Sequence, residues 1–246
     1  TSNATAINES GTIVGSSGYE PPETSESYRA FSYSAGTMTN LGTLAVGGYS
    51  HAYGVNNSGT VVGWASVSYG VNQAFSYTSS EGMKNLGSLP GGASSAAYGI
   101  NDSSTVVGYS NASSGYNHAF SYSDGTMTDL GILPGYVNSY ALGINDSGTI
   151  VGDASTQYGN ASHAIIYSDG AWSDLNNPTL TLNLPSGWLM EEATAINASG
   201  DIVGYGQNAS ELDEAFLLTP TPEPGSLALL AVGGIGLLIR RRNNRR

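Results

Sequence analysis

The sequence has no cysteine and, outside its last few residues, almost no basic side chains. Without cysteine the chain forms no disulfide and has no thiolate metal ligand or cysteine nucleophile. Five of its seven basic residues lie within 240–246, and only Arg29 and Lys84 lie upstream. Residues 1–225 therefore combine two basic with 19 acidic side chains, a net charge near −17. This charge repels phosphates, so we expect no nucleic-acid partner.

Long apolar runs are also absent, except for residues 226–239, SLALLAVGGIGLLI. This run is shorter than the roughly 20 residues of a typical spanning helix, so an interfacial or buried helix is an alternative. Arg240, Arg241 and Arg242 follow directly, and positive charge beside an apolar segment marks the cytoplasmic side. We therefore predict a transmembrane helix at 226–239, a basic cytoplasmic tail at 240–246, and an external location for everything before them.

Pro222, Glu223 and Pro224 lie in a Pro-rich linker, residues 220–225, ahead of the apolar run. Two prolines fix φ and interrupt regular hydrogen bonding, so the triplet is expected to be extended and accessible. The order of these features, first the triplet, then the apolar run and then the arginines, resembles the PEP-CTERM sorting tail of exported bacterial proteins. The resemblance implies that an exosortase recognises the triplet and removes the tail, so the protein is first anchored in the inner membrane and then reaches the cell surface or the extracellular space.

An ordinary C-terminal anchor with a Pro-rich hinge is the alternative to a sorting tail. Either arrangement requires export. Because the opening residues, TSNATAINESG, lack a basic and apolar segment, we expect a secretory signal to have preceded them.

The body of the chain, residues 1–219, consists of one repeated unit. Its first phrase, of the type AYGINDSSTVVG, begins near residues 4, 52, 97, 141 and 193. Its second phrase, of the type HAFSYSDGTMTDLG, follows each copy, but the fifth stops after EAFLLTP. Each phrase reads as two short strands around an Asn/Ser/Gly or Asp-Gly turn. We predict an all-β domain of about five four-stranded units, β-propeller-like, with a β-solenoid as the alternative.

The second phrase resembles the HAF repeat of exported bacterial proteins, through His118, Ala119 and Phe120 and the flanking SYSDGTMTDLG. The first position of this motif varies along the chain, and it holds Arg29, Gln73, His118, His163 and Glu214. The resemblance implies a repeat architecture and no particular activity. A position that accepts Arg, Gln and Glu is not a general base or metal ligand, so we interpret His118 and His163 as strand-end residues.

Carboxylates follow the same variable pattern. Asp102 and Asp146 align with Glu9, Asn57 and Ala198, while Asp129 and Asp174 align with Asn40 and Asn85. Such interchange fits turn and strand-end hydrogen bonding better than acid–base chemistry. We therefore predict no catalytic residue, no metal site and no cofactor. Calcium stays an alternative because the turns are oxygen-rich, although no complete calcium-binding loop is present.

These features predict a non-catalytic surface or extracellular-matrix protein that binds or organises exopolysaccharide or protein partners. Loop tyrosines at 69, 116 and 158 could stack on sugars, or could simply cover hairpin faces. Two alternatives stay open. One is a polysaccharide-acting enzyme, with its site near the elaborated segment 176–192, which holds Trp188, Glu191 and Glu192. The other is a calcium-dependent adhesin.

Overall fold

The computed structural model describes residues 1–19, 27–157, 162–177, 187–220 and 235–237, and within these ranges every regular element is a β-strand. The strands form five antiparallel sheets of four strands, each built from consecutive strands of the chain. Sheet 1 contains β1 (Ser2–Ile7), β2 (Ile13–Tyr19), β3 (Ser27–Ser34) and β4 (Thr37–Gly42). Sheet 2 contains β5 (Ser50–Val55), β6 (Val61–Ser68), β7 (Val71–Thr78) and β8 (Gly82–Gly87). Sheet 3 contains β9 (Ser95–Ile100), β10 (Val106–Asn111), β11 (Asn117–Ser123) and β12 (Thr126–Asp129). Sheet 4 contains β13 (Asn138–Ile144), β14 (Ile150–Ser155), β15 (Ser162–Ser168) and β16 (Ala171–Asp174). Sheet 5 contains β17 (Leu189–Ile196), β18 (Ile202–Gln207), β19 (Asp213–Pro220) and β20 (Ile235–Leu237).

Two kinds of turn produce the hairpins. In the first, the Asn56 side-chain oxygen accepts the Thr60 N–H at 2.9 Å, while Gly59 takes a φ of 83°. In the second, Asp124 and Gly125 both have positive φ, 51° and 81°, as a type I′ turn requires. Type I′ turns match the right-handed twist of the strands that they join. The same pair of positive φ angles occurs at Ala35–Gly36 of sheet 1 and Asp169–Gly170 of sheet 4, so in these units the local sequence dictates both hairpins.

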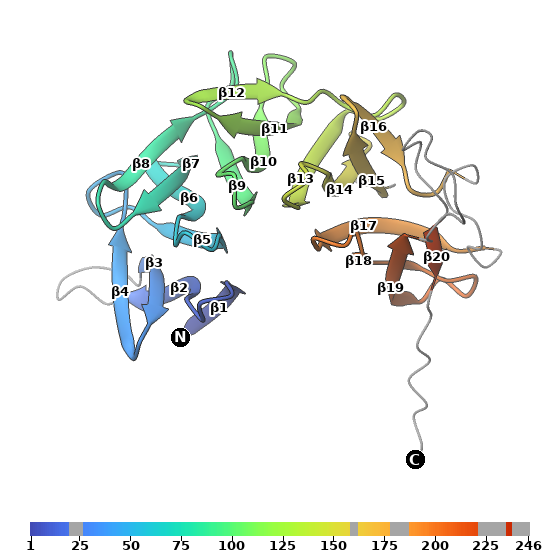
Figure 1. Cartoon of the computed structure of the whole chain (residues 1–246). Helices are drawn as coiled ribbons and strands as arrows, with labels where there is room; N and C mark the ends of the chain where they lie inside the picture. The colour runs from blue at the N-terminus through green and yellow to red at the C-terminus, as the bar shows by residue number, and fades with distance from the viewer. Residues whose placement is uncertain (20–26, 158–161, 178–186, 221–234, 238–246) are drawn as a thin grey trace.

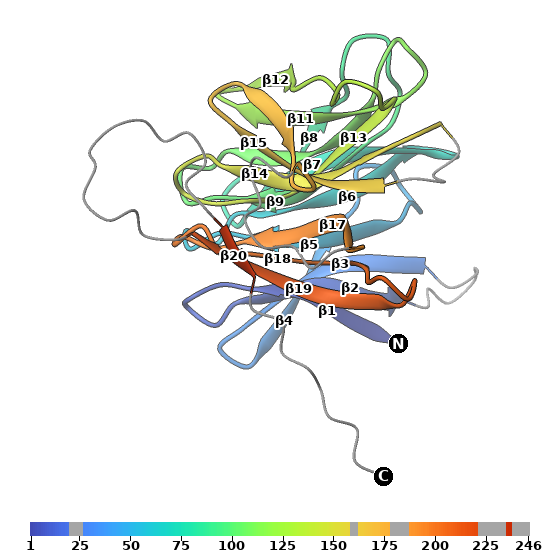
Figure 2. The same ribbon diagram turned by 90° about the vertical axis from the view of Figure 1, so that its right-hand side faces the viewer.

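The five sheets are arranged around a common centre in an arc, with the first strand of each sheet innermost (Figure 1). In Figure 2 the strands run roughly horizontally, along the axis of that arc. Extensive contacts between sheets join only neighbours in chain order, and the arc stays open between sheets 1 and 5. The prediction of an all-β chain of five antiparallel sheets is confirmed, and the radial order is that of a β-propeller and not of a solenoid.

Hydrophobic side chains fill the wedges between neighbouring sheets. Val62 and Ala74 of sheet 2 pack with Ala97 and Phe120 of sheet 3, and all four are fully buried. The Gly that ends each Val-Val-Gly segment allows a close approach, because a Cβ on Gly63 would overlap the backbone oxygen of His51. Small and large residues thus stand side by side on one strand, Gly63 next to Val62 and Ala74 next to Phe75, and each sheet is covered by its neighbour.

Buried serines join the outer strands of one sheet to the inner strand of the next. Ser95, which is 2% exposed, accepts a hydrogen bond from the Ala74 N–H and donates one to the Gly87 carbonyl. Ser50 and Ser139 make the equivalent pairs of bonds. Because a buried hydroxyl without partners is costly, these bonds fix the register in which neighbouring sheets dock.

The C-terminal region differs from the sequence-based expectation. The helix predicted at 226–239 is not confirmed, because Ile235–Leu237 form β20, which pairs with β19 through Leu218↔Leu237. The fifth repeat lacks its closing phrase, which leaves the outer edge of β19 open to such a strand. The sorting triplet, Arg240–Arg242 and the rest of the predicted helix lie outside the described residues. No helix long and apolar enough to span a membrane occurs in the part of the chain that is described.

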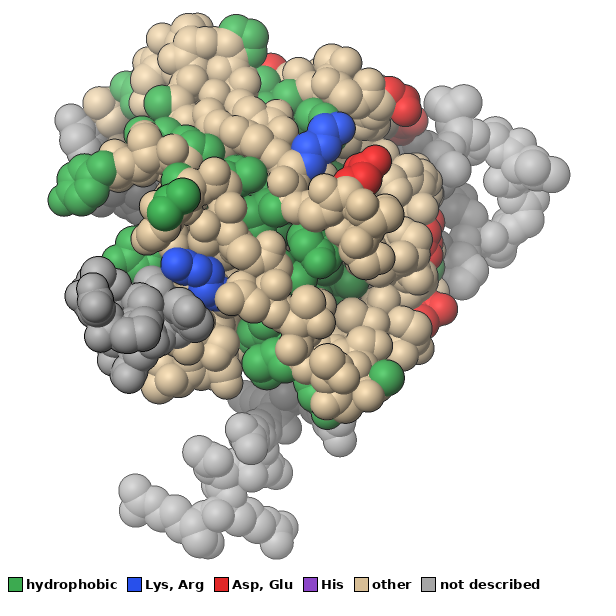
Figure 3. All heavy atoms as spheres, turned by 90° about the vertical axis from the view of Figure 1, so that its left-hand side faces the viewer, with side chains coloured by type: hydrophobic (Ala, Val, Ile, Leu, Met, Phe, Trp, Pro, Cys, Tyr) green, Lys and Arg blue, Asp and Glu red, His purple; other side chains and the backbone are tan. Residues whose placement is uncertain are grey.

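The outer wall beside sheets 1 and 2 carries few charged side chains and consists mainly of uncharged polar groups, backbone and scattered hydrophobic groups (Figure 3). Among the side chains that the structure describes, the charge of the body is therefore not gathered on this side.

Candidate functional site

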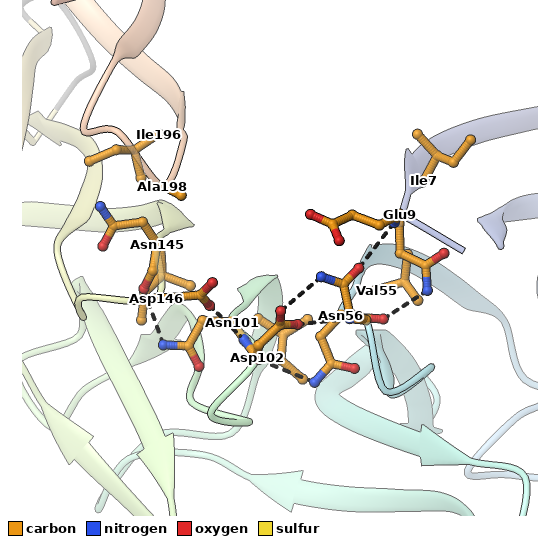
Figure 4. A pocket seen from close by; sticks show the side chains of 14 residues that line it. Ile7, Glu9, Val55, Asn56, Asn101, Asp102, Asn145, Asp146, Ile196 and Ala198 are labelled. Carbon is orange, nitrogen blue, oxygen red and sulfur yellow. Dashed lines mark hydrogen bonds between the residues drawn. The ribbon is translucent and has the colours of Figure 1, made fainter. Parts of the chain in front are cut away.

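A pocket of about 220 Å³ lies at one end of the arc's centre, where the first turns of all five sheets converge (Figure 4). Sheets 1 to 4 each contribute an aliphatic residue, the turn asparagine and the residue after it, and sheet 5 contributes an aliphatic residue and the residue after its turn asparagine. The lining residues are Ile7, Asn8, Glu9, Val55, Asn56, Asn57, Ile100, Asn101, Asp102, Ile144, Asn145, Asp146, Ile196 and Ala198. We call this the axial pocket.

The turn asparagines link the sheets into a series that we call the asparagine ladder: Asn8, Asn56, Asn101, Asn145 and Asn197. The Asn56 side-chain amide donates to the Asn101 carbonyl at 3.1 Å, and Asn101 donates in turn to the Asn145 carbonyl at 3.2 Å. Asn8 and Asn145 extend the series to sheets 1 and 5. Each of these asparagines also closes its own turn with its oxygen, so one side chain holds both a hairpin and an interface between sheets.

The residues after the asparagines form a second series. Asp102 accepts the Asn57 N–H and the Asn57 side-chain amide, both at 2.8 Å, and Asp146 accepts the Asp102 N–H at 2.9 Å. Asn57 accepts the Glu9 N–H in the same way at 3.0 Å. An amide and two carboxylates therefore perform one task, which is why they interchange in the sequence. This agrees with the interpretation of these side chains as hydrogen-bonding groups of the turns.

Metal ligands do not gather in the described ranges, where no group of three or more His, Asp or Glu side chains is placed to hold an ion. In the axial pocket the oxygens of Asp102 and one oxygen of Asp146 already accept hydrogen bonds. Calcium binding thus stays a prediction that these contacts do not favour.

A row of rings in contact with one another, some stacked and others tilted or edge-on, runs from sheet 1 to sheet 4, and we call it the aromatic row. Its members are Tyr28, His51, Trp64, Tyr53, Tyr98, Tyr109 and Tyr140. The ring centroids of His51 and Trp64 lie 4.5 Å apart, and the Trp64 indole N–H donates to the Tyr53 hydroxyl at 3.1 Å. Burial lowers the pKa of His51 and raises that of Tyr98, so both are uncharged at neutral pH.

Acidic groups continue the aromatic row into sheets 4 and 5. Asp153 lies opposite Tyr140 in the strand pairing, is 9% exposed and accepts the Ser162 hydroxyl at 3.2 Å. Burial, with the charge of Glu192 added, raises the pKa of Asp153 to about 7. Glu192 accepts the Tyr205 hydroxyl at 2.9 Å, and burial together with this contact raises the pKa of Tyr205 to about 12. The inner surface thus changes from aromatic to acidic along the arc.

The two histidines of the second phrase occupy matched positions near the starts of β11 and β15. His118 contacts Asp129 at 2.9 Å, and His163 contacts Asp174 at 2.6 Å. In sheet 2 the same two positions hold Gln73 and Asn85, which are also hydrogen-bonded, at 2.7 Å. The pairing is retained while the chemistry changes, which supports a role in closing the outer hairpin.

The other residues singled out from the sequence are scattered. Tyr69 is fully exposed at a hairpin tip, Tyr116 is half-buried, and Tyr158 lies outside the described residues. Of the elaborated segment, Glu192 joins the acidic end of the aromatic row, whereas residues 178–186 are not described. The sequence analysis missed Asp153. Its signal was a break in the repeat, because the equivalent positions hold Ser16, Trp64, Tyr109 and Tyr205.

Comparison with known families defines the class of protein. A model of the PEP-CTERM protein-sorting motif matches residues 220–242, and the arc of sheets precedes this motif directly. The protein is therefore exported, anchored in the membrane before exosortase processing, and then displayed at the cell surface. Among curated proteins, none is significantly similar in sequence.

Two solved structures are similar to this chain. One is the β-propeller domain of the Trilobed protease from Pyrococcus furiosus, with 11% identity and a TM-score of 0.35, covering 88% of this chain and 48% of the other. The other is a mutant of AofleA from Arthrobotrys oligospora, with 11% identity and a TM-score of 0.44, covering 96% of this chain and 72% of the other. This chain spans about half the length of the Pyrococcus domain. At these values the likeness concerns the fold alone.

Proposed function

We propose that the protein is a non-catalytic binding protein of the cell surface or extracellular matrix, whose partner is an exopolysaccharide. The observation that carries the proposal is the aromatic row. Its rings are half-buried and therefore keep part of their surface accessible, and they carry hydroxyl, imidazole or indole groups at their edges. Aromatic rings with a polar edge bind sugar rings by stacking and hydrogen bonding together.

The repeat architecture supports an extended partner rather than a small one. The aromatic row crosses four sheets, so successive rings present similar surfaces at successive positions. The axial pocket, at about 220 Å³, is smaller than most small-ligand sites. A polymer of repeated sugars matches a repeated surface.

Binding is tested with the full chain and the Trp64→Ala variant against a panel of immobilised bacterial polysaccharides. Trp64 stacks on His51 and is only partly buried, so its removal should weaken binding about tenfold, the effect of losing one stacking contact and its polar edge. Tyr69→Ala is the matched control, because Tyr69 is fully exposed at the tip of the β6–β7 hairpin and is not a member of the aromatic row. If both variants bind like the parent chain, the row is not the binding surface.

Sorting is tested separately by Glu223→Ala in cells that contain the exosortase. The triplet Pro222, Glu223 and Pro224 would be read by the enzyme, so the variant should accumulate uncleaved in the membrane fraction. Asp213→Ala, which removes one carboxylate from β19 ahead of the sorting motif, is the control. Equal release of Glu223→Ala and the parent chain would contradict recognition of the triplet.

An enzyme acting on polysaccharide is the second candidate, favoured by one observation. Asp153 and Glu192 interact electrostatically, and burial keeps Asp153 partly protonated near neutral pH while Glu192 is hydrogen-bonded to Tyr205. Glycoside hydrolysis uses a pair of carboxyl groups that flank the scissile bond, one of them kept protonated by its surroundings. Release of reducing ends in the binding assay, abolished by Glu192→Gln, would replace the binding proposal with this one.

A further inference from the structure

The two ends of the arc present surfaces that elsewhere in the molecule are buried between sheets. In sheets 2 to 5 the inner-strand alanine, Ala52, Ala97, Ala141 or Ala193, is 0% exposed, because it packs against the preceding sheet. The equivalent Ala4 of sheet 1 is exposed. Ile7, beside the first turn, is 65% exposed. We call this surface of sheet 1 the leading face.

Sheet 5 shows the converse. In sheets 1 to 4 the second-strand valine, Val14, Val62, Val107 or Val151, is 0% exposed, because the next sheet covers it or its strand. The equivalent Val203 is 42% exposed, and Tyr205 on the same side of β18 is also 42% exposed. Ala215 of β19 is exposed as well, whereas its equivalents Ala30, Ala74, Ala119 and Ala164 are all fully buried. We call this surface of sheet 5 the trailing face.

The asparagine ladder ends at the same two surfaces. Asn197 donates its side-chain amide to Asp201 of its own turn at 2.8 Å, whereas the other four asparagines donate to the next sheet. At the other end is the backbone carbonyl of Asn8. The equivalent carbonyls of Asn56, Asn101, Asn145 and Asn197 each accept a hydrogen bond from the asparagine side chain of the preceding sheet. The leading face thus offers the acceptor, and the trailing face offers the donor, of one further step of the ladder.

The occupant must match both faces and fit the gap. A second copy of the chain has a leading face for the trailing one, but it would bring five sheets into an opening smaller than the arc itself (Figure 1). Two copies whose bodies each carry about −17 also repel each other. On the C-terminal side, the segment that follows β19 is the sorting motif at 220–242 and not another copy of the repeat.

We propose that the open sector is a docking site for further sheets of the same repeat, joined in series ahead of β1. Such a sheet would cover Ala4 and Ile7 with its Val and Ala side chains and would supply the amide for the Asn8 carbonyl. The added sheet farthest from β1 would place its inner strand against Val203 and Tyr205 of sheet 5 and so complete the ring. This inference concerns the scaffold and does not depend on which ligand the aromatic row takes.

The test adds repeats to the full chain. One version of the chain carries a copy of residues 94–137, which is one repeat, before Thr1. A second version carries a copy of residues 49–137, which is two repeats, and a third version carries one repeat more. Side-chain exposure is measured by hydroxyl-radical oxidation of Ile7, Val203 and Tyr205. We expect every extended chain to show less oxidation of Ile7 than the unextended chain. In the extended chain whose number of repeats fills the open sector, we also expect the oxidation of Val203 to fall to that of Val151, its buried equivalent in sheet 4.

A matched pair of variants keeps the result interpretable. Val203→Asp should leave the melting temperature of the unextended chain unchanged, because the side chain is exposed there, but should abolish the protection gained in the extended chain. Val151→Asp should lower the melting temperature in both, since it buries a charge. Protection of Val62 shows that the extended chains are folded.

Two results would overturn the proposal. One is that no extension of one to three repeats protects Val203, which would mean that the trailing face stays open. The other is that the unextended chain already shows both faces protected and a doubled mass by light scattering, which would identify a second copy as the occupant.

Discussion

Replacing Asn101 with alanine is expected to lower the free energy of unfolding by about 3 kcal/mol. Asn101 is 5% exposed and accepts the Thr105 N–H at 2.9 Å while donating to the Asn145 carbonyl at 3.2 Å. Alanine leaves the Thr105 N–H without its side-chain acceptor and removes the bond between sheets 3 and 4, while the Asn145 carbonyl keeps its bond from the Gly148 N–H. The cost exceeds that of an ordinary hydrogen bond because a turn and an interface between sheets are weakened together.

The matched control is Asn197→Ala at the end of the ladder. Asn197 also closes its turn, accepting the Asp201 N–H at 2.8 Å, but its amide bonds only within that turn and both bonds are exposed. Its loss should cost about 1 kcal/mol or less. Urea unfolding followed by circular dichroism measures both. Equal effects for the two variants would show that the ladder contributes nothing beyond turn formation.

Asp153→Asn is expected to stabilise the protein at pH 8 and to have little effect at pH 4. In the folded chain the pKa of Asp153 lies near 7, above its ordinary value of 3.8, because burial and the charge of Glu192 oppose ionisation. Between these values the folded state binds more protons than the unfolded state, so stability falls as pH rises from about 4 to about 7 and then levels off. The loss is at most about 4 kcal/mol.

Asparagine removes the ionisation and keeps an oxygen that can accept the Ser162 hydroxyl. Thermal melts across pH 4 to 8 should therefore show a smaller decline for the variant than for the parent chain. Glu192 and Tyr205 also face this region, so Glu192→Gln should give a weaker change in the same direction. A variant whose stability declines with pH as steeply as that of the parent would show that Asp153 ionises freely in the folded state.

Asp174 provides a control of opposite sign. Burial by itself would raise its pKa, but hydrogen bonds from His163 and Asn176 outweigh burial and hold the pKa below its ordinary value. The stability that ionised Asp174 contributes is therefore present at pH values above its pKa in the unfolded chain. It is lost as the pH falls through its pKa in the folded chain. Asp174→Asn should consequently destabilise the protein at neutral pH and converge with the parent chain in acid, which a general effect of removing charge would not produce.

The local structure of each repeat was predictable because short-range chemistry dictates it. The Asn-x-Ser-Gly and Asp-Gly turns need backbone angles that Gly, Asn and Asp accept most readily, and the alternating small and β-branched residues fix strand and face. The interchange of Asn57, Asp102 and Asp146 likewise pointed to a shared hydrogen-bonding task. These inferences required no knowledge of how the sheets are placed.

The aromatic row and the acidic end at Asp153 were not predictable in the same way. Tyr53 and Tyr98 hold the same position of their repeats, but that position lies about 45 residues away in the next repeat, so the sequence does not show that the rings touch each other or Tyr109. Their association depends on the angle at which neighbouring sheets dock. The apolar run at 226–239 also suits more than one environment, and three of its residues pair with β19.

The sequence alone determined the all-β class, the number of repeats, the acidic body and the sorting tail, because composition, periodicity and a contiguous motif are properties of neighbouring residues. Only the tertiary structure decided which side chains share the inner surface, that Asp153 is buried beside Glu192, and that Ala4 and Val203 face an open sector. Burial and proximity between repeats arise from packing of whole sheets, and each sheet needs a neighbour to hide the faces that its own hairpins leave open.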